Sequence, residues 1–322
     1  MSRTRRTLAA IALASATVLS LAACSGSSTS SSSAATTTTT EAAAGTFTAP
    51  GDADKGGKDN PVKIGVVGSS GPQWDTFEKD ANAAGIYVDL VDFSDYQQPN
   101  PQLAAGQLDL NQFQHILFLA QYNNESGEKL AAIGSTAIYP LGLYSEKYKS
   151  VAEIPQGAQV AVPNDGTNQA RALGVLQSAG LITLKSGTGA LVATPDDVDT
   201  AASKVVVTPV AADQTARSLG DKQIAAAIVN NDYVTDTGLE PSDAIAKDDP
   251  SADSAKPFIN IWAAREADAD NPVYLKLIEI AQSADVEADL QDNSGGTAVI
   301  VHETPANLAT YLADAEAQLT NK

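Results

Sequence analysis

The sequence predicts an α/β protein with largely parallel sheets, folded as two lobes behind an export signal. Strand-like and helix-like segments alternate from Pro61 onward, which is the pattern of layered α/β folds. Roughly 260 residues follow Pro61, a length that suits two lobes better than one compact sheet. The start of the chain has the zones of a secretory signal, so we expect the folded body outside the cytoplasmic membrane.

Residues 1–23 have the layout of a signal peptide, with an apolar stretch from Leu8 to about Leu21. That stretch is too short and too rich in alanine to span a membrane, which takes about 20 strongly apolar residues. Leu21-Ala22-Ala23-Cys24 resembles the bacterial lipobox, in which the cysteine is lipidated and becomes the mature N-terminus. We therefore expect a lipid anchor on Cys24, at the extracytoplasmic face of the cell membrane. The alternative to the lipobox is an ordinary cleavage site with a chance cysteine. Arg5-Arg6 separately leaves twin-arginine export open as the export route.

Residues 24–60 consist mainly of Ser, Thr, Ala and Gly, and they lack the apolar side chains needed to form a core. We therefore expect a disordered tether between the lipid and the folded body. Cys24 is the only cysteine, so no internal disulfide can form. The chain carries 39 acidic and 20 basic residues, a formal net charge of −19. A surface of this charge repels nucleic acid, which we exclude as a partner.

Short apolar runs rich in β-branched residues predict the strands, the first being Val62-Lys63-Ile64-Gly65-Val66-Val67. In chain order the predicted strands cover residues 62–67, 86–93, 137–143, 159–162, 204–207 and 224–229. The first helix begins near Pro72, which suits a first helical turn, and ends before Gly85. Apolar residues at helical spacing predict further helices at 112–122, 168–179, 211–219 and 272–284.

The strongest local signal for a binding site runs from Val160 to Arg171, where a strand ends at Pro163 and a polar turn leads into a helix. Thr167 or Asn168 can cap that helix. Free N–H groups and the helix dipole favour an anion there, and the nearby guanidinium of Arg171 matches a carboxylate. A capped helix with a solvated arginine is the alternative.

A second signal is a concentration of aromatic residues in a chain that is only 5% aromatic. A pocket lined by such rings suits an apolar or thioether side chain. On a helix, Phe113 would belong to the core stripe with Ile116, and His115 and Phe118 would share a neighbouring face. A structural histidine and a core phenylalanine are the alternatives. The aromatic residues concerned are Phe93, Tyr96, Phe113 and Phe118.

A third, weaker signal is Asn230-Asn231-Asp232-Tyr233, directly after the predicted strand 224–229. Polar residues at the carboxyl ends of strands are where open α/β sheets hold ligands. A simple turn is equally compatible with this pattern.

Motifs of several chemistries are missing from the sequence. It has two distant histidines and no Cys/His cluster for a transition metal, no glycine-rich phosphate loop, and no Gly-x-Ser-x-Gly elbow. We therefore expect no enzyme activity, no cofactor and no bound metal, and we expect a monomer.

Seven stretches, taken in chain order, resemble the NlpA/MetQ family, the methionine-binding lipoproteins of ABC importers. The resemblance covers the chain from about Pro61 to the C-terminus, with the lipobox and tether in front. Seven matches in the family's order are far more specific than any single motif. The stretches are VKIGVV, VDFSDYQQPN, LDLNQFQH, YPLGLYSEKYKS, VAVPNDGTNQARAL, AGLITLK and IVNNDY.

The resemblance implies a two-lobed, type II-like periplasmic-binding-protein fold with the ligand in a cleft between the lobes. One lobe would comprise residues 61–139 and 234–322, and the other residues 140–233. The implied ligand is methionine, which a permease and ATPase complex in the membrane would receive. In the matching positions, the methionine side chain and part of its polar end would be wrapped by Tyr96, Phe113, His115 and Phe118. The α-amino acid group would be held by Asn168, Arg171 and Asn230.

Three positions depart from the family's usual pattern. Gly166 replaces a proline in the turn, Ala170 replaces a glycine before the arginine, and Phe118 replaces a tyrosine and so lacks its hydroxyl. The ligand alternatives are another amino acid, D-methionine or a short methionine-containing peptide. A surface interaction lipoprotein with no transport role is a further alternative.

Overall fold

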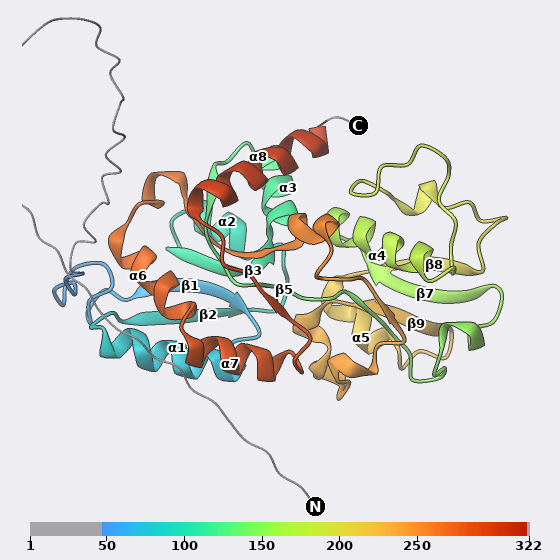
Figure 1. Cartoon of the computed structure of the whole chain (residues 1–322), viewed down its shortest axis with the longest axis horizontal. Helices are drawn as coiled ribbons and strands as arrows, with labels where there is room; N and C mark the ends of the chain where they lie inside the picture. The colour runs from blue at the N-terminus through green and yellow to red at the C-terminus, as the bar shows by residue number, and fades with distance from the viewer. Residues whose placement is uncertain (1–46, 321–322) are drawn as a thin grey trace, which may run out of the picture. The chain divides into compact units, whose positions relative to one another are not determined.

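The computed structural model describes residues 47–320 (Figure 1). Cys24, the signal peptide 1–23 and the tether up to residue 46 lie outside the described residues. Within residues 47–320, no helix has both the length and the apolar character to cross a membrane.

Lobe 1 is built on a five-stranded sheet in the order β2-β1-β3-β11-β4. The strands β2, β1 and β3 run parallel, whereas β11 is antiparallel to both of its neighbours, β3 and β4. These strands are β1 (Val62–Val67), β2 (Val88–Phe93), β3 (Leu110–His115), β4 (Leu130–Ser135) and β11 (Asn260–Arg265). A separate antiparallel pair joins β5 (Ala137–Ile138) to β12 (Val299–Ile300).

Lobe 2 is built on a second five-stranded sheet in the order β10-β6-β9-β7-β8. Its strands β8, β7 and β9 are parallel, and β6 and β10 complete the sheet in antiparallel register. The strands are β6 (Gly142–Tyr144), β7 (Ala158–Pro163), β8 (Val205–Val210), β9 (Ile224–Val229) and β10 (Ala246–Lys247).

Helices cover the faces of both sheets, and their apolar sides form the cores (Figure 1). In lobe 1, α1, α6 and α7 lie on one side of the sheet and α3 and α8 on the other; in lobe 2, α4 and α5 flank β7. The α-helices are α1 (Pro72–Ala83), α2 (Pro99–Ala104), α3 (Ile116–Ser126), α4 (Gly166–Ser178), α5 (Thr215–Ser218), α6 (Pro272–Ala281), α7 (Ala284–Asn293) and α8 (Pro305–Thr320).

The parallel strands next to helices follow the predicted pattern, and β1, β7, β8, β9 and α1 are confirmed close to their predicted bounds. The predicted helix 112–122 is wrong at its start, because Leu110–His115 is the central strand β3 and the helix begins at Ile116. Phe113 is therefore a strand residue and not part of a helical stripe. The predicted strand 137–143 is interrupted between Ile138 and Gly142, where the chain passes from lobe 1 to lobe 2.

The prediction of a disordered tether up to residue 60 is wrong for residues 47–60. This segment is fixed on lobe 1 by backbone and side-chain contacts. Lys55 Nζ lies 3.0 Å from Asp109 Oδ2, and the backbone N–H of Tyr87 donates to Gly56 O at 2.8 Å. Phe47 packs against the apolar cluster that contains Trp74. The few apolar and charged residues in this segment are thus enough to dock it, despite its polar composition.

The lobe boundary near residue 234 also needs correction. The chain leaves β9 and forms a short 3-10 helix, Asn231–Tyr233, but it then returns to lobe 2 as β10. The edge of β6 is open to another strand, and β10 pairs with it. The backbone N–H of Ile245, just before β10, donates to Leu143 O of β6 at 2.8 Å. The chain rejoins the sheet of lobe 1 only with β11.

Gly57→Ala tests whether the docked segment 47–60 contributes to stability. A Cβ at this position would lie 2.0 Å from Gly51 O, a backbone atom that cannot move aside independently. We expect a loss of about 1–3 kcal/mol in the free energy of unfolding, measured by urea denaturation. Gly174→Ala is the control, since a Cβ there meets nothing within 4 Å and alanine favours the helix. Equal unfolding curves for the wild type and Gly57→Ala would contradict the docking.

Candidate functional site

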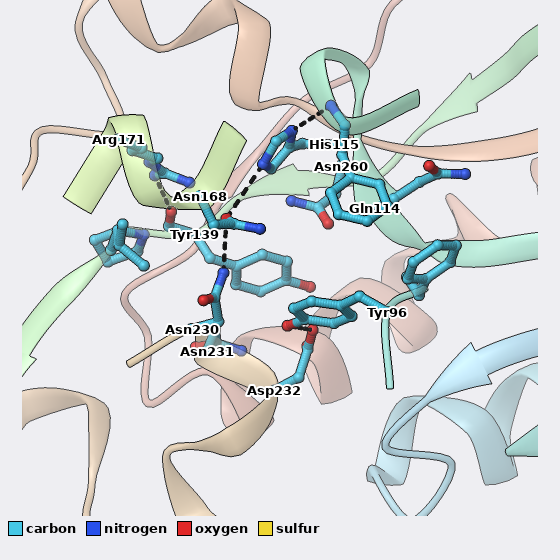
Figure 2. Close-up of a pocket in the computed structure, with 14 residues that line it drawn as sticks. Tyr96, Gln114, His115, Tyr139, Asn168, Arg171, Asn230, Asn231, Asp232 and Asn260 are labelled. Atoms are coloured by element: carbon cyan, nitrogen blue, oxygen red, sulfur yellow. Dashed lines mark hydrogen bonds between the residues drawn. The ribbon is translucent and has the colours of Figure 1, made fainter. Parts of the chain in front are cut away.

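A pocket lies between the two lobes, and all seven predicted site residues line it (Figure 2). Lobe 1 contributes the turn after β2, the end of β3 and the first turn of α3. Lobe 2 contributes α4 and the segment after β9, and the crossing between β5 and β6 closes one side. The predicted lining residues are Tyr96, Phe113, His115, Phe118, Asn168, Arg171 and Asn230, and the others are Gln114, Tyr139, Pro140, Leu141, Asn231, Asp232 and Asn260.

Arg171 is buried and its guanidinium is held on several sides. Its Nε lies 2.7 Å from Asp248 Oδ2, and its Nη2 donates to Tyr139 O at 2.8 Å. Its Cζ lies 4.2 Å from the centre of the Phe258 ring, a cation–π distance. No hydrogen bond from Nη1 is found to any described residue, so donors at that end are available to a ligand.

The start of α4 differs from the prediction in its cap. Asp165, rather than Thr167 or Asn168, is the N-cap, and its Oδ1 accepts from Asn168 N at 3.0 Å. The cap therefore frees the Asn168 side chain to reach into the pocket, while its Nδ2 also donates to Asp165 Oδ1 at 2.9 Å. Asn168 and Arg171 of this helix line the pocket, but the Asp165 carboxylate already accepts from one of the first-turn N–H groups that we expected to attract an anion.

Asn168 and Asn230 form the polar floor of the pocket. Asn230 Nδ2 donates to Asn168 Oδ1 at 2.8 Å, and His115 Nε2 lies 3.4 Å from the same oxygen. Asn230 Oδ1 is buried and has no hydrogen-bond partner among the described residues. A buried amide oxygen without a donor is costly, so this oxygen is a candidate acceptor for an N–H group of a ligand.

His115 is neutral and its proton lies on Nε2. It ends β3 and caps α3, where its Nδ1 accepts from Phe118 N at 3.1 Å. Burial, together with the positive charge of Arg171, lowers the pKa of His115 to about 3. A nitrogen that accepts from a backbone N–H cannot carry the proton, so Nε2–H points toward Asn168 (Figure 2).

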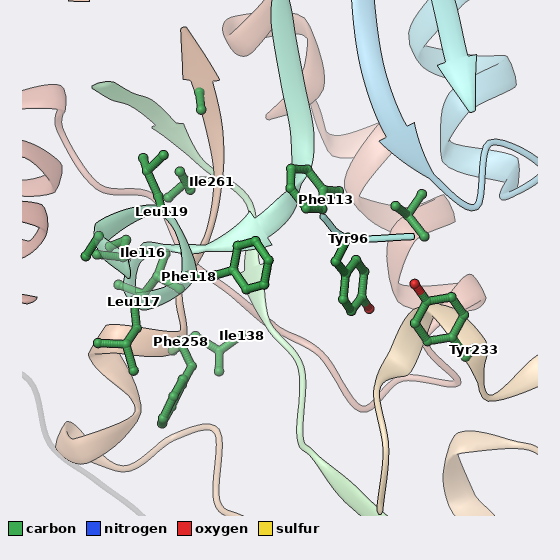
Figure 3. Close-up of a cluster of buried hydrophobic side chains, with 14 of the residues drawn as sticks. Tyr96, Phe113, Ile116, Leu117, Phe118, Leu119, Ile138, Tyr233, Phe258 and Ile261 are labelled. Carbon is green, nitrogen blue, oxygen red and sulfur yellow. The ribbon is translucent and has the colours of Figure 1, made fainter. Parts of the chain in front are cut away.

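Three aromatic rings enclose the other end of the pocket (Figure 3). Their centroids are 5.9 Å apart for Tyr96 and Phe113, 6.1 Å for Tyr96 and Phe118, and 5.8 Å for Phe113 and Phe118. These are ordinary packing distances for ring pairs. The predicted aromatic wall is therefore present, although Phe113 reaches it from a strand.

Asp232 lay within the weak third sequence signal but was not predicted as a site residue. Its Oδ2 accepts from the Tyr96 hydroxyl at 2.7 Å, so the two side chains join the lobes across the pocket. Burial raises the pKa of Asp232 to about 6, against the effect of that hydrogen bond. Its position directly after a strand was the available signal.

Gln114 and Asn260 had no comparable signal in the sequence. Gln114 belongs to a buried amide network, in which it exchanges hydrogen bonds with Asn100 and donates to Asn111 at 2.9 Å. This network fixes the end of β3. Asn260 enters the pocket at the start of β11, far along the chain from the other lining residues.

The arrangement is suited to holding a zwitterion with an apolar tail. Guanidinium donors lie at one side, an unpaired amide oxygen lies on the floor, and rings enclose the rest. None of the lining residues is Ser, Thr, Cys or Lys.

Residues 62–301 match the family model described as NlpA lipoprotein. The D-methionine-binding lipoprotein MetQ of Yersinia pestis is 40% identical over 245 residues, which cover 75% of this chain and 89% of that protein.

Solved structures are similar to most of the folded body. Protein PG110 from Staphylococcus aureus matches with a TM-score of 0.74 and 36% identity, covering 79% of this chain and 99% of that one. The substrate binding protein of a methionine transporter from Streptococcus pneumoniae matches with a TM-score of 0.69 and 37% identity, covering 75% and 95%. The predicted two-lobed binding-protein fold is thereby confirmed.

His115→Gln tests the buried neutral histidine. The unfolded chain takes up a proton near pH 6.5, whereas folded His115 resists protonation down to about pH 3. Stability is therefore lost as the pH falls below 6.5, by about 2 kcal/mol at pH 5. We expect the wild type to lose about that much more unfolding free energy than the variant between pH 7 and pH 5. Asp232 acts with the opposite sign in both proteins, so it cancels in the difference; parallel pH curves would refute the assignment.

Proposed function

This chain belongs to the NlpA lipoprotein family, and from that premise we propose that it captures methionine outside the membrane for an ABC importer. A relative at 40% identity is named a D-methionine-binding lipoprotein, and a similar solved structure is a methionine transporter's binding protein. Both names support the ligand class and the transport role. We propose binding without catalysis, and delivery to a permease and its ATPase.

The observation that carries this proposal is the pairing of Arg171 with the unpartnered Asn230 Oδ1. A free amino acid has a carboxylate and an ammonium group on one carbon. The open Nη1 end of Arg171 supplies charged donors for the carboxylate, and Asn230 Oδ1 accepts from the ammonium group. A ligand with only one of these groups would leave a buried polar atom unpaired.

The aromatic wall supports a thioether side chain at the other end. Tyr96, Phe113 and Phe118 present ring edges and faces to one small space. A methionine side chain is flexible, and its polarizable sulfur gains about 0.3–1.5 kcal/mol beside an aromatic ring. The ring of Phe118 offers no hydroxyl, which favours an apolar side chain over a polar one.

The two ends of the pocket come from different lobes, which suggests how capture works. The rings belong to lobe 1, while Arg171 and Asn230 belong to lobe 2. A ligand that contacts both lobes stabilises the closed form by its difference in affinity for the two forms. A lipid on Cys24 would keep the loaded protein close to the importer and raise its effective concentration there.

Arg171→Ala tests the proposed function in calorimetric titration with L- and D-methionine. The loss of the guanidinium leaves the ligand carboxylate buried without its partner, so binding should weaken by about 2–5 kcal/mol. Arg217→Ala is the matched control, since Arg217 is also on a lobe 2 helix but its side chain is 56% exposed and it lies outside the pocket. Near-wild-type affinity in Arg171→Ala would rule out the carboxylate assignment.

Cys24→Ala tests the anchor. Without the thiol there is no site for the lipid, so the protein should leave the membrane fraction for the soluble fraction. Methionine affinity should not change, because the pocket lies entirely in the folded body. A variant that stays firmly membrane-bound would show that another part of the chain holds it there.

A further inference from the structure

Asp248 lies outside the pocket lining, yet it contacts the residue on which ligand recognition depends. Its Oδ2 lies 2.7 Å from Arg171 Nε, and its Oδ1 accepts from Leu141 N at 2.8 Å. The Asp248 backbone N–H also donates to Leu141 O at 3.3 Å. The carboxylate is thus held between α4 and the segment that crosses between the lobes.

We propose that Asp248 is a positioning residue that holds the Arg171 guanidinium with its Nη1 end facing the ligand. The proposal rests on the proposed function, because it concerns how the ligand carboxylate is recognised. An arginine side chain has many rotamers, and freezing one costs free energy on binding. The contact with Asp248 fixes the Arg171 rotamer before the ligand binds, so the ligand does not bear that cost.

The direction of approach follows from the guanidinium's own geometry. Its donors lie in one plane, and carboxylates bind along its edges. Asp248 occupies the Nε edge, Tyr139 O takes one Nη2 donor, and the Phe258 ring covers one face. Nη1 and the rest of Nη2 are what a ligand can reach, so the three contacts select one binding geometry.

The same contacts tie Arg171 to both segments that run between the sheets. Tyr139 and Leu141 lie between β5 and β6, whereas Asp248 and Phe258 lie between β10 and β11. Lobe closure requires movement of these crossing segments. Because Arg171 is bonded to both, its orientation stays fixed relative to them as the lobes move.

Electrostatics alone would predict the opposite effect of Asp248 on affinity. A carboxylate 2.7 Å from Arg171 offsets part of the positive charge that attracts the ligand. If charge dominated, removal of Asp248 would tighten methionine binding. If positioning dominates, removal weakens it. The two accounts therefore predict opposite changes in methionine affinity when Asp248 is removed.

Asp248→Asn decides between them in titrations with methionine and with methioninamide, whose carboxamide lacks the charge. We expect methionine affinity to fall about tenfold or more and methioninamide affinity to change little. The ratio of methionine affinity to methioninamide affinity should therefore fall. A merely structural role would weaken both ligands alike and leave the ratio unchanged. An unchanged ratio, or tighter methionine binding, would overturn the proposal.

The matched control is Asp268→Asn, because Asp268 Oδ2 contacts Arg265 Nε at 2.6 Å in the same geometry but outside the pocket. It should leave both affinities unchanged. Asp248→Glu guards against misfolding of the asparagine variant, since it keeps the charge and shifts it by one methylene. In Asp248→Glu the ratio of methionine affinity to methioninamide affinity should also fall, while the melting temperature of the variant should equal that of the wild type.

One readout separates this proposal from the proposed function. In the protein without ligand, the Arg171 Nε–H signal in a nitrogen–hydrogen NMR spectrum should exchange slowly with water. Asp248→Asn should make it exchange quickly, and Asp268→Asn should not. If the wild type fails to bind methionine, the proposed function is wrong, and this signal still tests the Asp248 contact. An equally slow signal in Asp248→Asn would overturn the positioning role.

Discussion

A buried guanidinium must have its charge and its N–H groups satisfied, and much of this cleft is organised by that requirement at Arg171. Three groups satisfy part of this requirement: the backbone oxygen of Tyr139, the carboxylate of Asp248 and the ring of Phe258. They come from segments that run between the two sheets, so the requirement also fixes where those segments pass. The Nη1 end of the guanidinium has no hydrogen-bond partner among the described residues, and Arg171 lines the pocket.

The polar floor beside Arg171 follows from the same charge. Burial, and to a lesser extent the positive charge of Arg171, lowers the pKa of His115, which therefore stays neutral and serves as a donor toward Asn168. Asn168 can accept from both sides because Asp165, and not Asn168 itself, caps α4. Asn230 is then oriented through its amide N–H, which leaves its oxygen available. As a result, the site has hydrogen-bond donors at Arg171 and a free acceptor at Asn230 Oδ1.

The sequence was most informative where local chemistry decides the structure. The strand, turn and arginine between Val160 and Arg171 placed the polar end of the site, and the aromatic concentration placed its apolar end. Phe113 was assigned to a helix because its spacing to Ile116 and Leu117 fits one. Its place in strand β3 depends on pairing with β11, which lies far later in the chain, and this is a tertiary effect that local spacing cannot reveal.

Long-range contacts account for the other differences. Asp248 and Arg171 are 77 residues apart, and nothing local to Asp248 distinguishes it from neighbouring acids. β10 is two residues long and exists because β6 has an open edge. Residues 47–60 have the composition of a tether, yet one ion pair and a few backbone bonds dock them. The helix α8 was not predicted, although its buried residues Leu308 and Leu312 have the four-residue spacing of one helix face.

The most direct test of the central claim is a crystal structure of the folded body grown with saturating methionine. The account predicts one methionine in the pocket, with its carboxylate on the Nη end of Arg171 and its ammonium group on Asn230 Oδ1. Its sulfur should lie among the rings of Tyr96, Phe113 and Phe118. A pocket that stays empty at saturating methionine, or a ligand whose carboxylate avoids Arg171, would contradict the account.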